Sequence, residues 1–75
     1  MIYQLEYDSF TKLAETSGTI QNCSGYKVEI TDEPIFNSGI LINEGKSLNF
    51  SGTDIYVRCT EEGKKAKIRF VNALL

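Results

Sequence analysis

The side chains that could carry out chemistry in this 75-residue chain are few. The sequence contains two cysteines and no histidine. A cysteine nucleophile needs a base to activate its thiol, and histidine is the side chain that titrates near neutral pH. Zinc sites likewise draw on several cysteine and histidine ligands. We therefore expect no enzymatic activity, no metal site and no cofactor.

Two pairs of adjacent carboxylates could suggest acid-base catalysis. They are Asp32 with Glu33 and Glu61 with Glu62, and both pairs fall in expected loops. A glycosidase holds its two carboxyl groups apart across a cleft, which neighbours on an exposed loop rarely achieve. These residues are therefore expected to be solvated.

The sequence Gly45-Lys-Ser invites comparison with a phosphate-binding loop. That motif needs a glycine five positions before its second glycine and a helix after it. Here Gly39 precedes Gly45 by six positions, and Leu-Asn-Phe follows at the period of a strand. We interpret Glu44–Lys46 as a turn between two strands, with Gly45 tolerating a positive φ.

The length of the chain predicts one domain over residues 1–75 with a marginal core. Chains of this size gain stability from disulfides, a metal or association with other subunits. Cys23 and Cys59 could form one bridge, although two buried free thiols are the expected state because cysteine packs well as a small hydrophobe. Association, including homo-oligomer formation, is therefore the favoured source of extra stability.

The charges are mixed along the chain, with a net charge of −2. The basic cluster of Lys64, Lys65, Lys67 and Arg69 is expected to be a solvated hairpin face, and no nucleic-acid partner is expected. No run of residues is long and apolar enough for a membrane span, and the first residues lack a basic start followed by an apolar run. We therefore expect no membrane association, and synthesis in a reducing cytoplasm.

Alternation of apolar and polar residues predicts an all-β fold. Expected strands cover residues 2–7, 19–23, 26–30, 55–59 and 66–71, with further strands on either side of Glu44–Lys46. Glycines fall in or beside the proposed turns, a spacing typical of a small antiparallel β-sandwich or a jelly-roll-like barrel. The inward faces are expected to supply a core of Val28, Ile30, Leu41, Leu48, Phe50, Ile55, Val57, Ile68 and Phe70.

Two hairpins are expected from short connections. One joins 55–59 to 66–71 across Glu61–Lys64, and the other joins 19–23 to 26–30 across Ser24-Gly25. In the second hairpin Tyr26 is expected to face the core, and Lys27 and Glu29 to face water.

Two segments remain open to more than one interpretation. Residues 9–15 could form a short N-terminal helix or continue as an extended edge. Pro34 ends the preceding strand, so residues 32–38 form the longest loop. Its bulky Ile35 and Phe36 either cover the core or meet a partner.

The four tyrosines could form a binding platform, although core tyrosines with the hydroxyl at the rim are the more common arrangement.

The order of several phrases resembles a family of small tailed-bacteriophage virion proteins. The phrases, from about Phe10 to Val71, are Thr11-Lys-Leu-Ala, Ser17-Gly-Thr-Ile-Gln-Asn, Val28-Glu-Ile, Gly39-Ile-Leu-Ile-Asn-Glu-Gly-Lys-Ser-Leu-Asn-Phe-Ser-Gly, Ile55-Tyr-Val-Arg and Ala66-Lys-Ile-Arg-Phe-Val. The chain departs from the family pattern in Asn43, where proline is usual, and in its two cysteines.

The resemblance implies a compact β-sandwich or jelly-roll-like module that is displayed on a phage particle after synthesis in the host cytoplasm. Its function would be structural, as a capsid decoration or head-fibre component, with capsid or tail proteins as partners. Alternatives are a tail or fibre attachment module, or an adhesin domain that binds a host glycan through Tyr56, Arg58 and nearby loops. The expected interface residues are Ile35, Phe36, Tyr56 and Arg58.

Overall fold

The computed structural model describes residues 1–13, 17–51 and 54–72, and these contain eight strands and no helix. The strands are β1 (Ile2–Leu5), β2 (Thr11–Leu13), β3 (Ser17–Asn22), β4 (Val28–Thr31), β5 (Ile40–Ile42), β6 (Ser47–Ser51), β7 (Ile55–Cys59) and β8 (Ala66–Asn72). The all-β expectation is therefore confirmed. The helix considered for residues 9–15 is wrong where it can be examined, because Thr11–Leu13 is a strand with Leu13 buried; residues 14–16 lie outside the described part.

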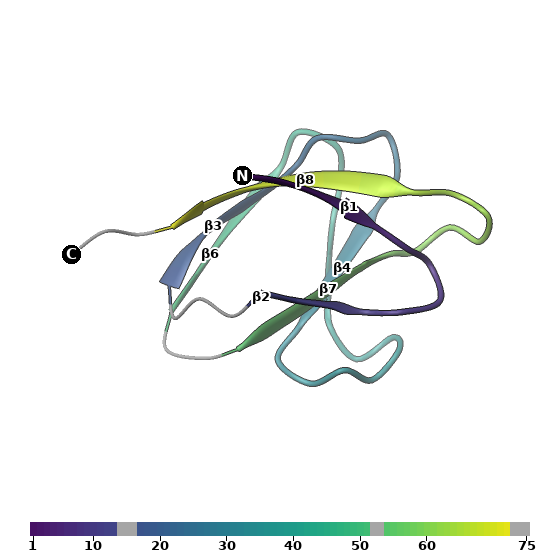
Figure 1. Ribbon diagram of the computed structural model, residues 1–75, viewed down its shortest axis with the longest axis horizontal. Coiled ribbons are helices and arrows are strands. Elements are labelled where there is room, and N and C mark those ends of the chain that lie inside the picture. Colours follow the sequence, from purple (N-terminus) through teal and green to yellow (C-terminus); the bar gives the residue numbers. More distant parts are fainter. Residues whose placement is uncertain (14–16, 52–53, 73–75) are drawn as a thin grey trace.

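The strands form two four-stranded antiparallel sheets that face each other (Figure 1). The first sheet, sheet A, has the order β1-β8-β3-β6, and the second, sheet B, has the order β2-β7-β4-β5. The chain crosses from one sheet to the other at every connection except the one between β4 and β5. Four of the six strand pairs among the described residues are nested: β4 pairs with β5, β3 with β6, β2 with β7 and β1 with β8. The other two, β3 with β8 and β4 with β7, join these pairs into the two sheets.

This topology contradicts both hairpins expected from the sequence. β7 and β8 lie in different sheets, and so do β3 and β4. A short loop with a glycine allows a hairpin, but it equally allows the chain to step across a sandwich. The alternating pattern shows which side of a strand faces the core and contains no information about which strand lies beside it.

Asn22 helps to explain why the β3–β4 connection crosses between sheets. This fully buried side chain donates through Nδ2 to the carbonyl oxygens of Tyr26 (2.7 Å) and Ile42 (3.0 Å). Its Oδ1 accepts hydrogen bonds from the backbone N–H and the hydroxyl of Ser24, both at 2.9 Å. The amide thus ties the end of a strand in sheet A to the connection and to β5 in sheet B.

The core lies between the sheets, and it agrees with the sequence for most residues. Of the nine expected core residues, six are buried: Val28, Ile30, Ile55, Val57, Ile68 and Phe70. Leu48 and Phe50 are half-buried against this core. Leu41 is wrong, because it is 54% exposed and Ile42 takes the buried position. The core also contains Leu5, Leu13, Ile20, Ile42, Cys59 and Ala66, which the list omitted.

The expectations for the tyrosines and cysteines are also confirmed for some residues and wrong for others. Tyr3 and Tyr26 pack against the core as half-buried residues. Both thiols are free, and Cys59 is buried as expected, but Cys23 is exposed. Cys23 lies one residue beyond the end of β3, where its N–H donates to Lys67 O at 2.9 Å and its side chain faces outward.

The turn interpretation of Gly45-Lys-Ser is confirmed. Lys46 N donates to Asn43 O at 3.1 Å, and Gly45 has a φ of 79°, a left-handed conformation that suits glycine. The segment after the turn is strand β6. No helix N-terminus is therefore available here to hold a phosphate.

Candidate functional site

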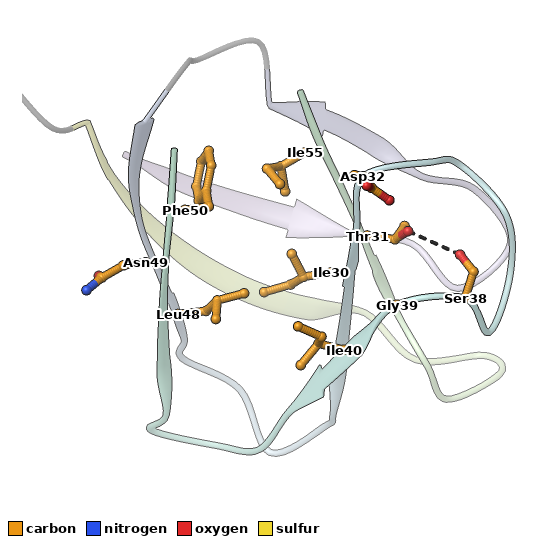
Figure 2. Close-up of a pocket in the computed structure, with 10 residues that line it drawn as sticks. All are labelled: Ile30, Thr31, Asp32, Ser38, Gly39, Ile40, Leu48, Asn49, Phe50 and Ile55. Atoms are coloured by element: carbon orange, nitrogen blue, oxygen red, sulfur yellow. Dashed lines mark hydrogen bonds between the residues drawn. The ribbon is translucent and has the colours of Figure 1, made fainter. Parts of the chain in front are cut away.

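The candidate site is the loop of residues 32–39, which joins β4 to β5 and folds back over the outer face of sheet B. Its path is set by local hydrogen bonds. Thr31 Oγ1 accepts from Glu33 N at 3.1 Å, Ile35 N donates to Glu33 O at 2.7 Å, and Ser38 Oγ donates to Ile35 O at 2.6 Å. The Thr31 and Ser38 hydroxyls lie 3.1 Å apart and close the base of the loop (Figure 2).

Two positions in the loop need special backbone conformations or space. Asn37 has a φ of 65°, in the left-handed region that asparagine tolerates better than most residues. A Cβ at Gly39 would collide with the carbonyl group of Ile30 and with Thr31 Cβ. The loop can therefore pass this close to β4 only because residue 39 is glycine.

The carboxylate of Glu29 anchors the loop from below. Glu29 lies on the outer face of β4 and is 0% exposed. Its Oε1 accepts from Asn37 N at 3.2 Å, and its Oε2 accepts from Gly39 N at 2.9 Å. One buried side chain thereby satisfies two backbone donors of the loop. The sequence had placed Glu29 in water, and this expectation is wrong because the loop covers it.

Arg58 lies opposite Glu29, on β7, and is 3% exposed. Its Nε donates to Glu29 Oε1 at 2.7 Å, and the remaining guanidinium nitrogens reach oxygens of three other residues. Nη1 donates to Tyr7 O (3.2 Å) and Cys59 O (3.1 Å), and Nη2 donates to Asn37 Oδ1 (3.2 Å). The buried charge is therefore both paired and hydrogen-bonded, which is the condition for tolerating it.

Three aromatic rings surround the guanidinium. The Arg58 Cζ atom lies 4.3 Å from the ring centroid of Phe36, 5.4 Å from that of Tyr7 and 5.8 Å from that of Phe10, within the range of cation–π attraction. Phe10 also packs edge-on against Phe36 with centroids 5.2 Å apart, and against Tyr56 at 6.4 Å. Segment 7–10, loop 32–39 and β7 thus share a small cluster outside the main core.

The electrostatics favour the charged form of Glu29. Burial of its carboxyl group acts to raise the pKa, but the hydrogen bonds from the Gly39 and Asn37 N–H groups and the nearby Arg58 outweigh this effect. The pKa of Glu29 therefore lies below its ordinary value, and the carboxylate is ionised at neutral pH.

The four expected interface residues occupy different positions in this arrangement. Ile35 is 54% exposed and Phe36 is 45% exposed, so both present apolar surface at the loop. Tyr56 is half-buried. Arg58 is enclosed within the molecule and presents almost no surface to a partner. The sequence analysis did not assign Glu29, Tyr7 and Phe10 to the site. One signal could have indicated them: Arg58 faces outward on its strand, and two loops of the chain contain aromatic residues that could cover it.

A second hollow lies between edge strands β5 and β6. Figure 2 shows Leu48 and Phe50 of β6 pointing into it, with Ile30 and Ile55 on the side of sheet B. The groove encloses about 330 Å³, at the lower end of the range for small-molecule pockets. Among the described residues that line it, Asp32 alone is charged. Apolar contact is therefore what this groove can offer.

Neither feature assembles a metal site from the described residues. Within residues 1–13, 17–51 and 54–72, no three His, Cys, Asp or Glu side chains gather closely enough to hold a metal ion. The same residues include no helix that could cross a membrane. Searches against family models, curated proteins and solved structures gave no significant match to this chain.

Proposed function

We propose that this protein is a structural component of a bacteriophage virion, a capsid decoration or head-fibre protein that acts by protein–protein assembly. The observation that carries the proposal is an exposed apolar pair, Ile35 and Phe36, on a loop that is already ordered by buried charges. Ordering an interface loop before binding removes part of the entropic cost of association. The loop is therefore suited to docking on a partner protein.

The order of the strands supports a jelly-roll topology within the sandwich. In a jelly roll, two Greek keys place eight strands in two sheets, and the fold recurs in viral capsid and lectin domains. The nested pairs β1/β8, β2/β7, β3/β6 and β4/β5 have this character. Fold alone does not define function, so the virion role depends on a binding experiment.

A tail or fibre attachment module remains an alternative within the same particle, and the glycan-binding adhesin is an alternative of another class. The geometry offers the adhesin little, because Arg58 is enclosed and Tyr56 packs edge-on against Phe10. A glycan site built on these two side chains would have to displace the aromatic cluster.

Binding to particles that lack this protein tests the proposal. Ile35→Ser removes exposed apolar surface, and we expect it to weaken co-sedimentation with such particles at least about tenfold, the size expected for an interface anchor. Phe36→Ser is a poorer test than Ile35→Ser, because Phe36 also covers Arg58 and contacts Phe10. The loss of that cover would destabilise the fold itself.

A matched control is available on the outer face of sheet A. Val71 is exposed to a similar degree as Ile35, at 52%, and lies on the other sheet, so Val71→Ser should leave particle binding unchanged. A wild-type protein that ignores the particles and binds a defined glycan on an array would overturn the proposal in favour of the adhesin.

A further inference from the structure

Strand β6 forms one edge of sheet A, and its outer backbone groups face away from the sheet. Among the described strands its one neighbour is β3. Asn22 N donates to Lys46 O at 3.0 Å, and Asn22 O accepts from Gly45 N at 2.8 Å, so the ladder begins with a bulged hydrogen-bonded pair. Such pairs alternate, so the backbone of Leu48 and Phe50 also faces β3. The N–H and C=O groups of Ser47, Asn49 and Ser51 therefore point outward.

Residues Ser47–Ser51 themselves carry none of the features that normally prevent edge-to-edge pairing; a bulge at Gly45 and Lys46 lies directly before them. Soluble proteins protect sheet edges with lysine, proline, inward charges or bulges. Ser47–Ser51 reads Ser-Leu-Asn-Phe-Ser and contains neither a charge nor a proline. No side chain of this strand would therefore repel a second strand through its charge.

The sequence of β6 has the same character in both directions about Asn49: a serine at each end, an apolar residue at each next position, and Asn49 at the centre. An interface between identical subunits related by a two-fold axis must complement itself. We propose that β6 pairs antiparallel with β6 of a second copy, about a two-fold axis at Asn49. Ser47 then lies opposite Ser51, and Leu48 lies opposite Phe50.

The apolar groove supplies further contact in this arrangement. Leu48 and Phe50 are half-buried in the single chain and line the groove, next to Ile40, which is mostly exposed. A second β6 alongside the first brings another Leu48 and Phe50 to the open side of the groove on the same face of the sheet. The Asn49 side chain points away from the groove (Figure 2) and accepts a hydrogen bond from Thr19 Oγ1 at 2.6 Å, so it lies on the outer face near the axis.

The charge balance also favours a second copy as the occupant. Two copies of a chain with a net charge of −2 repel each other, so a contact between them is favoured where the contact surfaces add no further like charges. The β6 edge meets that condition, and its free backbone groups supply hydrogen bonds that do not depend on the partner's side chains. The inference rests on the proposed role in protein assembly, but it requires no particle.

Analytical ultracentrifugation of the purified protein, with charge variants at Asn49, tests the pairing. We expect a wild-type dimer, and Asn49→Lys and Asn49→Asp should each raise the dimer dissociation constant at least about tenfold, because like charges then meet across the axis. Mixing the two variants should restore association to the wild-type level or better. Only an arrangement that brings residue 49 opposite its own copy predicts this recovery.

Proline variants provide a matched comparison on the two edges of sheet A. Asn49→Pro removes an outward N–H and should also disrupt the dimer. At the other edge, Met1 and Phe70 form a hydrogen-bonded pair, so the N–H of Gln4 likewise points outward and Gln4→Pro should leave the dimer intact. Thermal melts at protein concentrations below the dimer dissociation constant should show that both variants fold as monomers.

Three results would overturn the inference: a wild-type protein that is monomeric at millimolar concentration, an Asn49→Lys protein that dimerises as tightly as the wild type, or a mixture that fails to recover. These results differ from those that test the virion role. Particle binding is measured separately. A protein that dimerises but does not bind the particles would support the pairing of β6 strands and contradict the proposed function.

Discussion

Glu29 and Arg58 lie directly opposite each other on β4 and β7, with Arg58 Nε 2.7 Å from Glu29 Oε1 and both side chains withdrawn from water. The pair stands on the outer face of sheet B, outside the main core, and is covered by loop 32–39 and by aromatic residues from segment 7–10. The pair therefore stabilises the sandwich and also holds the conformation of the loop that exposes Ile35.

Removal of one member of this pair should destabilise the protein strongly. Glu29→Gln leaves the Arg58 charge buried without its counter-ion, and such losses commonly cost about 3–5 kcal/mol. Urea unfolding measures the effect. Glu6→Gln is the matched control, since the Glu6–Lys65 pair is exposed at 3.5 Å and an exposed pair is worth about 1 kcal/mol or less. Equal effects of the two substitutions would show that the buried pair has no special importance.

Stability should fall on acidification in a way that depends on Glu29. The pKa of Glu29 in the folded protein lies below its ordinary value of 4.5, so the folded state favours the ionised form. Its contribution is fully present above pH 4.5 and is lost as the pH drops through the folded-state pKa. Urea midpoints measured from pH 7 to pH 3 should decline less steeply below pH 4.5 in Glu29→Gln than in the wild type. Parallel curves would contradict this role.

The two thiols should differ in reactivity. Cys23 is exposed and Cys59 is buried, and neither is bridged. A thiol reagent should therefore label one cysteine per native chain and two after denaturation, and Cys23→Ser should abolish the native labelling. Reductant should leave the melting temperature unchanged, because no disulfide contributes to it. A melting temperature that falls with reductant would instead reveal a bridge.

Substitutions at Val57 and Leu41 separate the confirmed part of the expected core from the part that was wrong. Val57→Asp places an unpaired carboxyl group at a fully buried position, and we expect loss of the cooperative melt. Leu41→Asn introduces a polar but uncharged group at an exposed site on edge strand β5, which avoids repulsion with Glu29 opposite it, and we expect a change within about 0.5 kcal/mol. Calorimetry of both variants measures the difference, and a cooperative melt in Val57→Asp would count against the core assignment.

Periodicity predicted the fold class and most of the core because burial on a strand is a local property that recurs every second residue. It did not predict strand partners, since β7 and β8 are close in sequence and lie in different sheets. It also misplaced Glu29, which alternates with apolar neighbours as a solvated residue would. Whether a loop covers that residue depends on contacts of Phe36 and Phe10 with residues distant in sequence, which no local pattern contains.

The interface residues illustrate the same division. Bulky apolar residues beside Pro34 predicted a loop with exposed hydrophobic surface, and Ile35 has that surface. Arg58 was expected at the surface because it alternates with buried residues on β7, but its guanidinium reaches Tyr7, Glu29 and Asn37 in three separate segments. Only the assembled fold brings those partners together.

The nested strand pairs have a consequence for how the chain folds as it is synthesised. Among the strands that the structure describes, β4 and β5 are the only consecutive ones that pair, so they have the shortest loop to close. Each successive outer pair then requires only a modest further entropic cost of loop closure, because the inner pair already holds the chain together. β8 is made after the other seven strands, yet it lies between β1 and β3. Sheet A therefore has a vacant interior position until β8 leaves the ribosome, and the final strand completes the sandwich from within.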